Sequence, residues 1–154
     1  MAPASLRQKA DRTNEPSSKL LHAAASCFIQ KGYQSTTLDD IANTAAISRR
    51  SIYHYFNSKR EILEAVCRLQ AELFLEEVNQ QVDYEGDFAQ FINDCLFYVI
   101  NKAPESELFM IRIENADLDP VMLYFGDQRI IQAWIDFFEP YYIEAVEEGK
   151  IPPS

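Results

Sequence analysis

Residues 36–56 constrain the fold more than any other stretch of the chain, because they read as two short helices joined by a tight turn. Thr37 can cap the first helix, and the carboxylate of Asp40, three residues further on, completes an acidic form of the capping box. The turn ends at Ser48, which can cap a second helix predicted over 49–56. This arrangement is typical of a helix-turn-helix, which places its second helix in the major groove of DNA.

The second helix is predicted to have an outward face with the chemistry of a DNA reader. Each residue turns an α-helix by about 100°, so positions can be counted from the apolar Ile52. The residues predicted to face inward with it are Ser48, Tyr55 and Phe56. The residues predicted to face outward are Arg50, Tyr53 and His54, with Arg49 and Ser51 on the flanks. Packing does not explain an exposed face of this composition, so we predict that it contacts DNA.

The charge of the chain is divided in a way that fits this prediction. The formal net charge is -10. Residues 1–60 hold nine Lys and Arg against four Asp and Glu, a net charge of +5, whereas residues 61–154 hold five against twenty, a net charge of -15. Because salt screens exposed charges beyond about 10 Å, a basic head can bind DNA while an acidic body stays away from it.

The rest of the chain predicts an all-α architecture, since apolar residues recur at helical spacing and no strand pattern or internal repeat occurs. We predict a flexible arm over 1–16, whose basic residues either touch DNA or belong to a solvated tail. A three-helix head over 17–60, a long connecting helix and a helical regulatory body over 61–154 follow. The predicted helices cover 17–31, 38–45, 49–56, 59–82, 87–102, 105–115, 120–125 and 127–148.

Three local features of these helices give sharper expectations. Ser58 and Glu61 read as a full capping box for the connecting helix. The helix over 87–102 is apolar over most of its circumference, which predicts that it is buried. Pro140 is predicted to kink the last helix.

The composition argues against several classes of protein. No apolar run reaches the roughly 18 residues of a membrane helix, and the first residues lack the apolar region of a secretory signal. We therefore expect a cytoplasmic protein without a membrane partner, whose three cysteines are reduced thiols in the core. His22 and His54 are the two histidines, and no nucleophile triad, glycine-rich phosphate loop or metal-ligand spacing occurs. We expect neither an enzyme nor a metal or cofactor site.

The segment from about Leu20 to Leu63 resembles the DNA-binding head of the TetR family of transcriptional regulators. The resemblance is carried, without a gap, by Ala24, Phe28, Gly32, Tyr33, Thr36 to Ala42, Ala45, Ile47, Ser48, Ser51 to Tyr53, Phe56 and Ser58 to Leu63. The family usually has Gly where Ala46 stands, and Ala costs about 1 kcal/mol there if the position needs a positive φ. The family often has Thr in place of Ser51 and His in place of Tyr55.

The head offers candidate contacts of two kinds. Arg49 and Arg50 are the best candidates for reading bases, because a guanidinium can bond guanine O6 and N7 together; the alternative is that both contact only phosphate. The resemblance implies phosphate contacts from Tyr53 and Lys59. The caps Thr37 and Ser48 either also donate to phosphate or act only as caps, and His54 either touches DNA or does not. The full candidate DNA-binding set is Thr37, Ser48, Arg49, Arg50, Ser51, Tyr53, His54 and Lys59.

The aromatic residues of the body form either a ligand cavity or a plain packed core, and the resemblance implies an effector pocket there. The candidate ligand-binding residues are Phe91, Phe97, Phe109, Trp134 and Phe138. The resemblance also implies a homodimer, but family members usually continue with two long helices that build its interface. This chain stops at Ser154, so we expect either an incomplete body or another mode of dimerisation.

These features predict a ligand-responsive transcriptional regulator, a repressor that a small-molecule effector releases from a double-stranded DNA operator. Effector binding is expected to shift the connecting helix and so change the separation of two heads in a dimer. The alternative is a helical protein-interaction module that keeps the fold without sequence-specific DNA binding. The acidic body and the missing interface helices give that alternative some weight.

Overall fold

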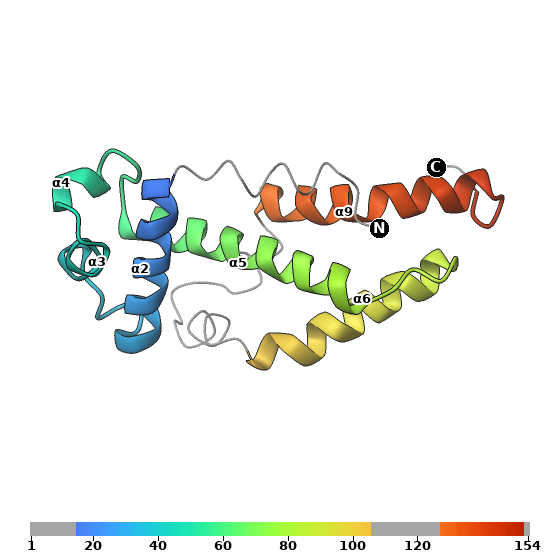
Figure 1. Ribbon diagram of the computed structural model, residues 1–154, viewed down its shortest axis with the longest axis horizontal. Helices are drawn as coiled ribbons and strands as arrows, with labels where there is room; N and C mark the ends of the chain where they lie inside the picture. The colour runs from blue at the N-terminus through green and yellow to red at the C-terminus, as the bar shows by residue number, and fades with distance from the viewer. Residues whose placement is uncertain (1–14, 106–126, 153–154) are drawn as a thin grey trace.

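The computed structural model describes residues 15–105 and 127–152, and no strand occurs among them. The helices in chain order are α2 (Glu15–Lys31), α3 (Leu38–Ala45), α4 (Arg49–Ile52), α5 (Lys59–Gln81), α6 (Phe88–Lys102), the short 3₁₀ helix η2 (Ala103–Glu105) and α9 (Gln128–Glu147). The molecule is elongated: α2, α3 and α4 lie at one end, and α5 leads from them to α6 and α9 (Figure 1). The predicted all-α fold class is confirmed.

The head has its own apolar core, where α2, α3, α4 and the first turns of α5 meet. Fully burying one large apolar side chain stabilises a fold by roughly 1.5–3 kcal/mol. α4 consists of four residues and contributes Ile52, which is 1% exposed, to this core. The largest buried side chains of the core are Leu20, Phe28, Ile41, Ile52, Ile62, Leu63 and Val66.

The turn between α3 and α4 contains a left-handed residue, Ala46, with a φ of 54°. Its N–H donates to the carbonyl of Asn43 at 3.2 Å, and the N–H of Ile47 donates to the carbonyl of Ala42 at 3.0 Å. These bonds satisfy carbonyls at the end of α3 and redirect the chain into α4. The position therefore does require a positive φ, and Ala46 carries the strain that the family's usual glycine avoids.

α4 ends at Ile52, not at Phe56 as predicted. The N–H of His54 donates to the carbonyl of Ser51 at 3.2 Å, and the N–H of Tyr55 donates to the carbonyl of Ile52 at 2.9 Å. Turns with bonds to the third residue back therefore replace the helix after Ile52. The helical projection therefore fails there. Tyr55 was predicted to face inward and is 39% exposed, and Ser48, predicted on the same face, is exposed as well.

Two other helix starts differ from the prediction in detail. α2 begins at Glu15, ahead of the predicted caps. At α5, Ser58 accepts a bond from the N–H of Glu61 at 3.1 Å, as expected. The carboxylate of Glu61, however, accepts from the backbone N–H of Asn57 at 2.8 Å, one residue before the expected partner. The capping box is therefore shifted by one residue on its acidic side.

The far part of α5 packs with α6 and α9 in a second apolar core. Leu75 and Val78 come from α5, Phe91 and Cys95 from α6, and Phe137 from α9. Aromatic rings fill much of this space. This second core holds the body together along one side of α5.

α6 is less buried than its composition predicted. Phe91 and Cys95 are its buried residues, whereas Leu96, Phe97 and Ile100 are 50%, 72% and 69% exposed. The prediction that the whole helix is buried was therefore wrong. An apolar circumference shows a preference for burial, but the described neighbours of α6 cover one side of it.

The predicted helices over 105–115 and 120–125 lie largely or wholly outside the described residues, as does Phe109. Pro140 lies inside α9, which continues past it to Glu147. Within the described part of the chain, none of the helices combines the length and apolar character needed to cross a membrane.

Candidate DNA-binding site

α4 lies at the end of the molecule farthest from the end of α9 (Figure 1). Ile52 anchors it to the head core, and the short element presents its other side chains to solvent. Arg49, Arg50, Tyr53 and His54 are all exposed, with 49% of Tyr53 accessible. The outward face predicted from the sequence is therefore present in the structure.

Ser48 and Ser51 form a polar start to α4. Ser48 Oγ accepts from the backbone N–H of Ser51 at 3.0 Å, and the two hydroxyl oxygens lie 2.8 Å apart. An N-cap bond of this kind stabilises a helix by about 1 kcal/mol. Both hydroxyls remain close enough to the surface to exchange these partners for phosphate oxygens.

The two arginines of the outward face differ in their surroundings. Arg49 Nη1 donates to Asp39 Oδ2 at 2.9 Å, an ion pair between α4 and the first turn of α3. Hydrogen bonding to Tyr53 and the charge of Asp39 both raise the pKa of Arg49. Arg50 has no polar partner among the described residues and is free to approach DNA. The sequence reasoning did not single out Asp39, because its contact with Arg49 depends on the angle between α3 and α4.

Lys59 was predicted to contact phosphate, and the structure gives it three protein partners. Its ammonium donates to the carbonyls of Tyr33 at 2.8 Å, Gln34 at 3.2 Å and Thr36 at 2.8 Å. It also lies 4.5 Å from the centre of the Tyr33 ring. Burial lowers the pKa of Lys59. In this structure Lys59 clamps the loop after α2 to the start of α5, and a phosphate contact would have to share these donors.

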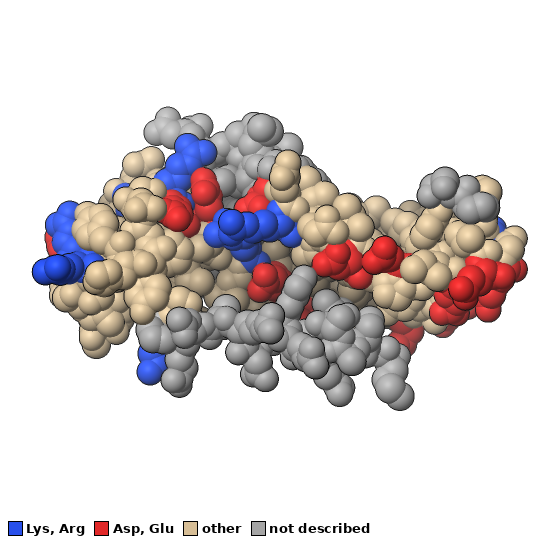
Figure 2. All heavy atoms as spheres, turned by 90° about the horizontal axis from the view of Figure 1, so that it is seen from above, with Lys and Arg blue, Asp and Glu red and all other residues tan. Residues whose placement is uncertain are grey.

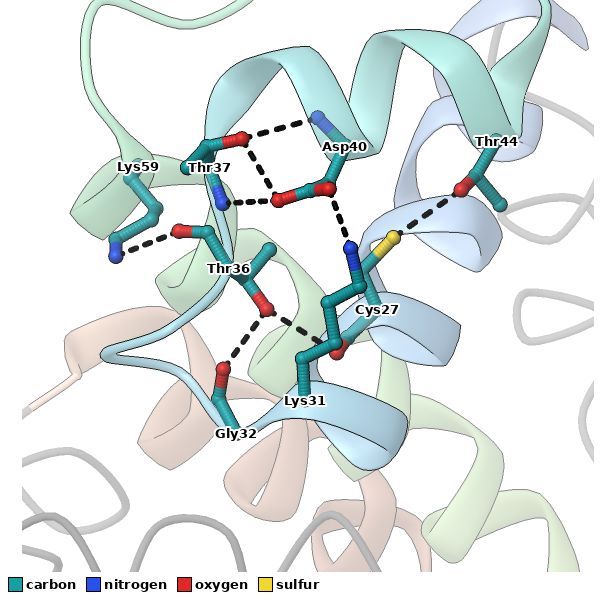
Figure 3. A network of polar contacts seen from close by, with 8 residues as sticks. All are labelled: Cys27, Lys31, Gly32, Thr36, Thr37, Asp40, Thr44 and Lys59. Atoms are coloured by element: carbon teal, nitrogen blue, oxygen red, sulfur yellow. Dashed lines mark hydrogen bonds and ion pairs between the residues drawn. The ribbon is translucent and has the colours of Figure 1, made fainter.

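A polar network joins this clamp to the start of α3 (Figure 3). The hydroxyl of Thr36, which is 1% exposed, lies 2.8 Å from the carbonyl of Gly32 and 3.1 Å from that of Cys27. Thr37 Oγ1 accepts from the N–H of Asp40 at 3.1 Å, and Asp40 Oδ2 accepts from the N–H of Thr37 at 2.9 Å. The predicted capping box is thus complete.

Lys31 extends the network by an ion pair with Asp40 that links the last turn of α2 to the first turn of α3. The bonds from Lys31 and Thr37 hold the pKa of Asp40 well below its usual range. The same acid therefore caps α3 and fixes the angle between the two helices. Thr37 is exposed and keeps access to solvent.

The charged side chains are distributed as the sequence predicted. In Figure 2, Lys and Arg are prominent at the end where α3 and α4 lie and again near the middle of the molecule, and Asp and Glu gather at the opposite end. A phosphate backbone would therefore meet the head in preference to the body.

The candidate ligand-binding residues of the body do not form one cluster. Phe91, Trp134 and Phe138 lie in or against the second core, with Phe91 5.9 Å and Trp134 5.8 Å from Phe138 between ring centres. Phe97 points away from that core and is largely exposed. It lines a shallow depression with Gln81, Val82, Asp83, Glu85, Asp94, Tyr98, Asn101 and Lys102.

Comparison with known proteins gives matches to the head and to the whole described fold. Residues 20–66 match the family described as bacterial regulatory proteins, tetR family. The repressor KstR2 of Mycolicibacterium smegmatis is 43% identical over 68 residues, which cover 44% of this chain and 31% of that protein. The uncharacterized regulator YhgD of Bacillus subtilis is 22% identical over 135 residues, which cover 87% of this chain and 71% of that protein.

A solved structure extends the likeness beyond the head. AibR, determined in complex with isovaleryl coenzyme A and operator DNA, is similar with a TM-score of 0.55 and 25% identity, over 90% of this chain and 76% of that one. The matched residues 20–66 build the head core, the turn at Ala46 and the exposed face of α4. Residues 20–66 therefore place the head of this chain in the tetR family of bacterial regulatory proteins, and the relatives that match it include transcriptional regulators and repressors.

Proposed function

We propose that the chain is a repressor that binds operator DNA through the outward face of α4 and leaves it when a small-molecule effector binds the body. The observation that carries the proposal is the exposed set of basic and aromatic side chains on α4, held on a packed head core. Tyr53 and His54 lie beside the two arginines and add donors for backbone or base contacts.

The roles in this proposal follow from the contacts of each side chain. Arg50, which has no partner among the described residues, and Arg49 read base edges. The hydroxyls of Thr37, Ser48 and Ser51, together with Tyr53, position the head on phosphates. Lys59 sits at the N-terminus of α5, which favours anions, so it can share its donors between the loop carbonyls and a phosphate.

The body is proposed to hold the effector and to act through α5. This helix joins the head core to the body core as one element of 23 residues, so a shift of its far end moves the head. The aromatic residues around Trp134 and Phe138 are the proposed site. Because AibR was solved with isovaleryl coenzyme A, acyl coenzyme A thioesters are the first class of effector to test.

A homodimer is part of the same proposal, because regulators with this motif bind two half-sites about 34–36 Å apart. The effector would then change the distance between the two heads of the dimer. An effector can shift binding only if it has different affinities for the DNA-bound and the free conformation. Light scattering of the chain alone and with a duplex would give the number of chains on the DNA.

The test of DNA binding begins with selection of bound sequences from a random duplex library by the 154-residue chain. A band shift then compares the wild type with an Arg49→Ala, Arg50→Ala double variant on the selected duplex. We expect the double variant to lose about 10²-fold or more in affinity, because two guanidinium contacts disappear. The control removes two cations from the body, Lys102→Ala with Arg129→Ala, and should change the affinity little. Equal binding by the wild type and the Arg49, Arg50 variant would reject the assignment of the site.

The test of the effector uses the single tryptophan of the chain as a reporter. Trp134 stacks against Phe138 at an angle of 22° between the rings, so a ligand near this pair should change its fluorescence. Isovaleryl coenzyme A is titrated against the protein, with free coenzyme A as the control for the nucleotide part. A fluorescence change with release of the duplex supports the class, and release by neither compound excludes it.

A further inference from the structure

Asp39 is an acid on the face of the head that would meet DNA, where phosphates repel a carboxylate. Its side chain is 60% exposed and bonds the guanidinium of Arg49, which is 54% exposed. The fold does not need Asp39 as a cap, because Thr37 and Asp40 already supply both halves of the capping box. Its one polar side-chain contact within the described residues is Arg49. Its charge suits the first turn of α3, and its side-chain bond is directed at Arg49.

An arginine on a DNA-binding face can be drawn to phosphate or to base edges. Each strand carries one phosphate charge per about 3.4 Å of helix axis, and these charges attract any free guanidinium, whatever the sequence. The carboxylate of Asp39 offsets part of the charge that would pull Arg49 toward phosphate, and its bond restrains the direction of the guanidinium. Asp39 engages one terminal nitrogen and Tyr53 also bonds the guanidinium, and the other N–H donors stay available for a planar acceptor pair.

We propose that Asp39 is a specificity-determining residue, which positions Arg49 for base reading and keeps it from binding phosphate. This inference rests on the proposed DNA-binding function and deepens it by stating how Arg49, one of the two proposed base readers, is held for that task. Asp39 itself makes no contact with a base in this proposal; it acts through Arg49. Without Asp39, Arg49 would become a general phosphate contact.

The experiment measures the affinity of the full chain for the duplex selected by the wild type and for a scrambled duplex, across a range of salt. Asp39→Asn keeps the size of the side chain and removes its charge. We expect this variant to bind the scrambled duplex more tightly and to lose roughly tenfold in the ratio of selected to scrambled affinity, the size of one base contact. The slope of log affinity against log salt should steepen by about 0.9, which corresponds to one added phosphate contact.

Three variants separate positioning from a simple gain of positive charge. Glu105→Gln removes a carboxylate from the body and should leave the ratio unchanged. Asp39→Glu keeps the carboxylate and should retain the ratio of selected to scrambled affinity. If a variant loses this ratio because it misfolds, its thermal transition will also change. In an Arg49→Ala background, Asp39→Asn should no longer alter the ratio, because the residue through which it acts is gone.

The outcomes are distinct. If Asp39→Asn raises both affinities by the same factor, or still lowers the ratio when Arg49 is absent, Asp39 does not position Arg49 and the inference is overturned. If the wild type enriches no sequence from the library, the proposed DNA-binding function itself fails, and the inference falls with it. A lower ratio, a steeper salt slope and no effect in the Arg49→Ala background together establish it.

Discussion

Arg68 Nη1 lies 3.2 Å from Asp127 Oδ2. Arg68 lies on α5, one residue after the head core, and Asp127 caps α9, so the contact joins these two helices. Both side chains are 21% exposed, so this pair is better shielded from water than the ion pairs within the head. Asp127 also accepts from the N–H of Arg129 at 2.9 Å and thereby fixes the first turn of α9. The contact connects the body to α5 close to the point where the helix enters the head.

Breaking this contact should loosen the body from the head. We expect Arg68→Met to lower the free energy of unfolding by about 1–2 kcal/mol, between the values for exposed and for buried pairs. Chemical denaturation measures the change. The control is Arg60→Met, whose pair with Glu64 is more exposed and should cost less than about 0.5 kcal/mol. Equal losses in the two variants would show that the Arg68–Asp127 pair has no special role.

The network around Asp40 should make stability depend on acidity. The bonds from Lys31 and then Thr37 lower the pKa of Asp40, so the native state holds this carboxyl ionised more strongly than the unfolded chain does. Its contribution is therefore fully present above the ordinary aspartate pKa of 3.8 and is lost as the pH falls through the lower native value. The stability difference between the wild type and Asp40→Asn should be constant near neutral pH and shrink below about pH 4.

Thermal melts of the wild type and Asp40→Asn between about pH 7 and pH 2 test this dependence. Lys31→Met serves as the second variant, because it removes the bond that lowers the pKa of Asp40 most while keeping the carboxylate and the cap. The stability of Lys31→Met should fall less steeply with decreasing pH than the stability of the wild type. A difference between the wild type and Asp40→Asn that stays constant down to the acid limit would contradict the argument.

The strained turn offers a gain in stability. Ala46 has a φ of 54°, a conformation that costs Ala about 1 kcal/mol and glycine nothing. Ala46→Gly should therefore stabilise the chain by roughly 0.5–1 kcal/mol in urea unfolding. The matched control is Ala89→Gly in α6, where the same exchange on an exposed helical site should destabilise by a similar amount. A loss at both sites would mean that the backbone at residue 46 gains nothing from glycine.

Two of the candidate ligand-binding rings should behave in opposite ways. Phe91 is 2% exposed and packs 4.6 Å from Tyr141 between ring centres, whereas Phe97 is 72% exposed. Phe91→Ala should cost about 3–5 kcal/mol of unfolding free energy, and Phe97→Ala should stay within about 0.5 kcal/mol of the wild type. Calorimetry on the three proteins measures both. A small cost at Phe91 would instead indicate that the ring borders a space that tolerates its removal.

The sequence predicted those features that depend on neighbouring residues. The capping box of Thr37 and Asp40, the cap at Ser48 and the basic face of α4 are local patterns, and all are present. The end of α4 was misplaced because Tyr55 and Phe56 continue the helical period, although turns already replace the helix. Features that depend on distant contacts were not predictable. Lys59 reaches carbonyls that lie 23 to 26 residues earlier, and Asp39 meets Arg49 only after the turn has closed.

The exposure of α6 shows the same limit in the body. Its sequence gives apolar residues on most sides, and this predicts burial only if neighbours exist to cover each side. Among the described residues, α5 and α9 cover the side with Phe91 and Cys95 and leave Ile100 exposed. Composition alone could not reveal which side that would be.

The central claim is that this chain recognises a DNA sequence, and one measurement tests it most directly. Fluorescence anisotropy compares binding of the 154-residue chain to the duplex selected from the random library and to a scrambled duplex of the same length, at several salt concentrations. Sequence-specific proteins typically bind their sites at least about 10³-fold more tightly than other DNA at physiological salt. We predict a preference of that order for the wild type. The Lys102→Ala, Arg129→Ala control should retain this preference, and the Arg49→Ala, Arg50→Ala variant should lose it. Equal affinity for the two duplexes at every salt concentration would contradict the claim.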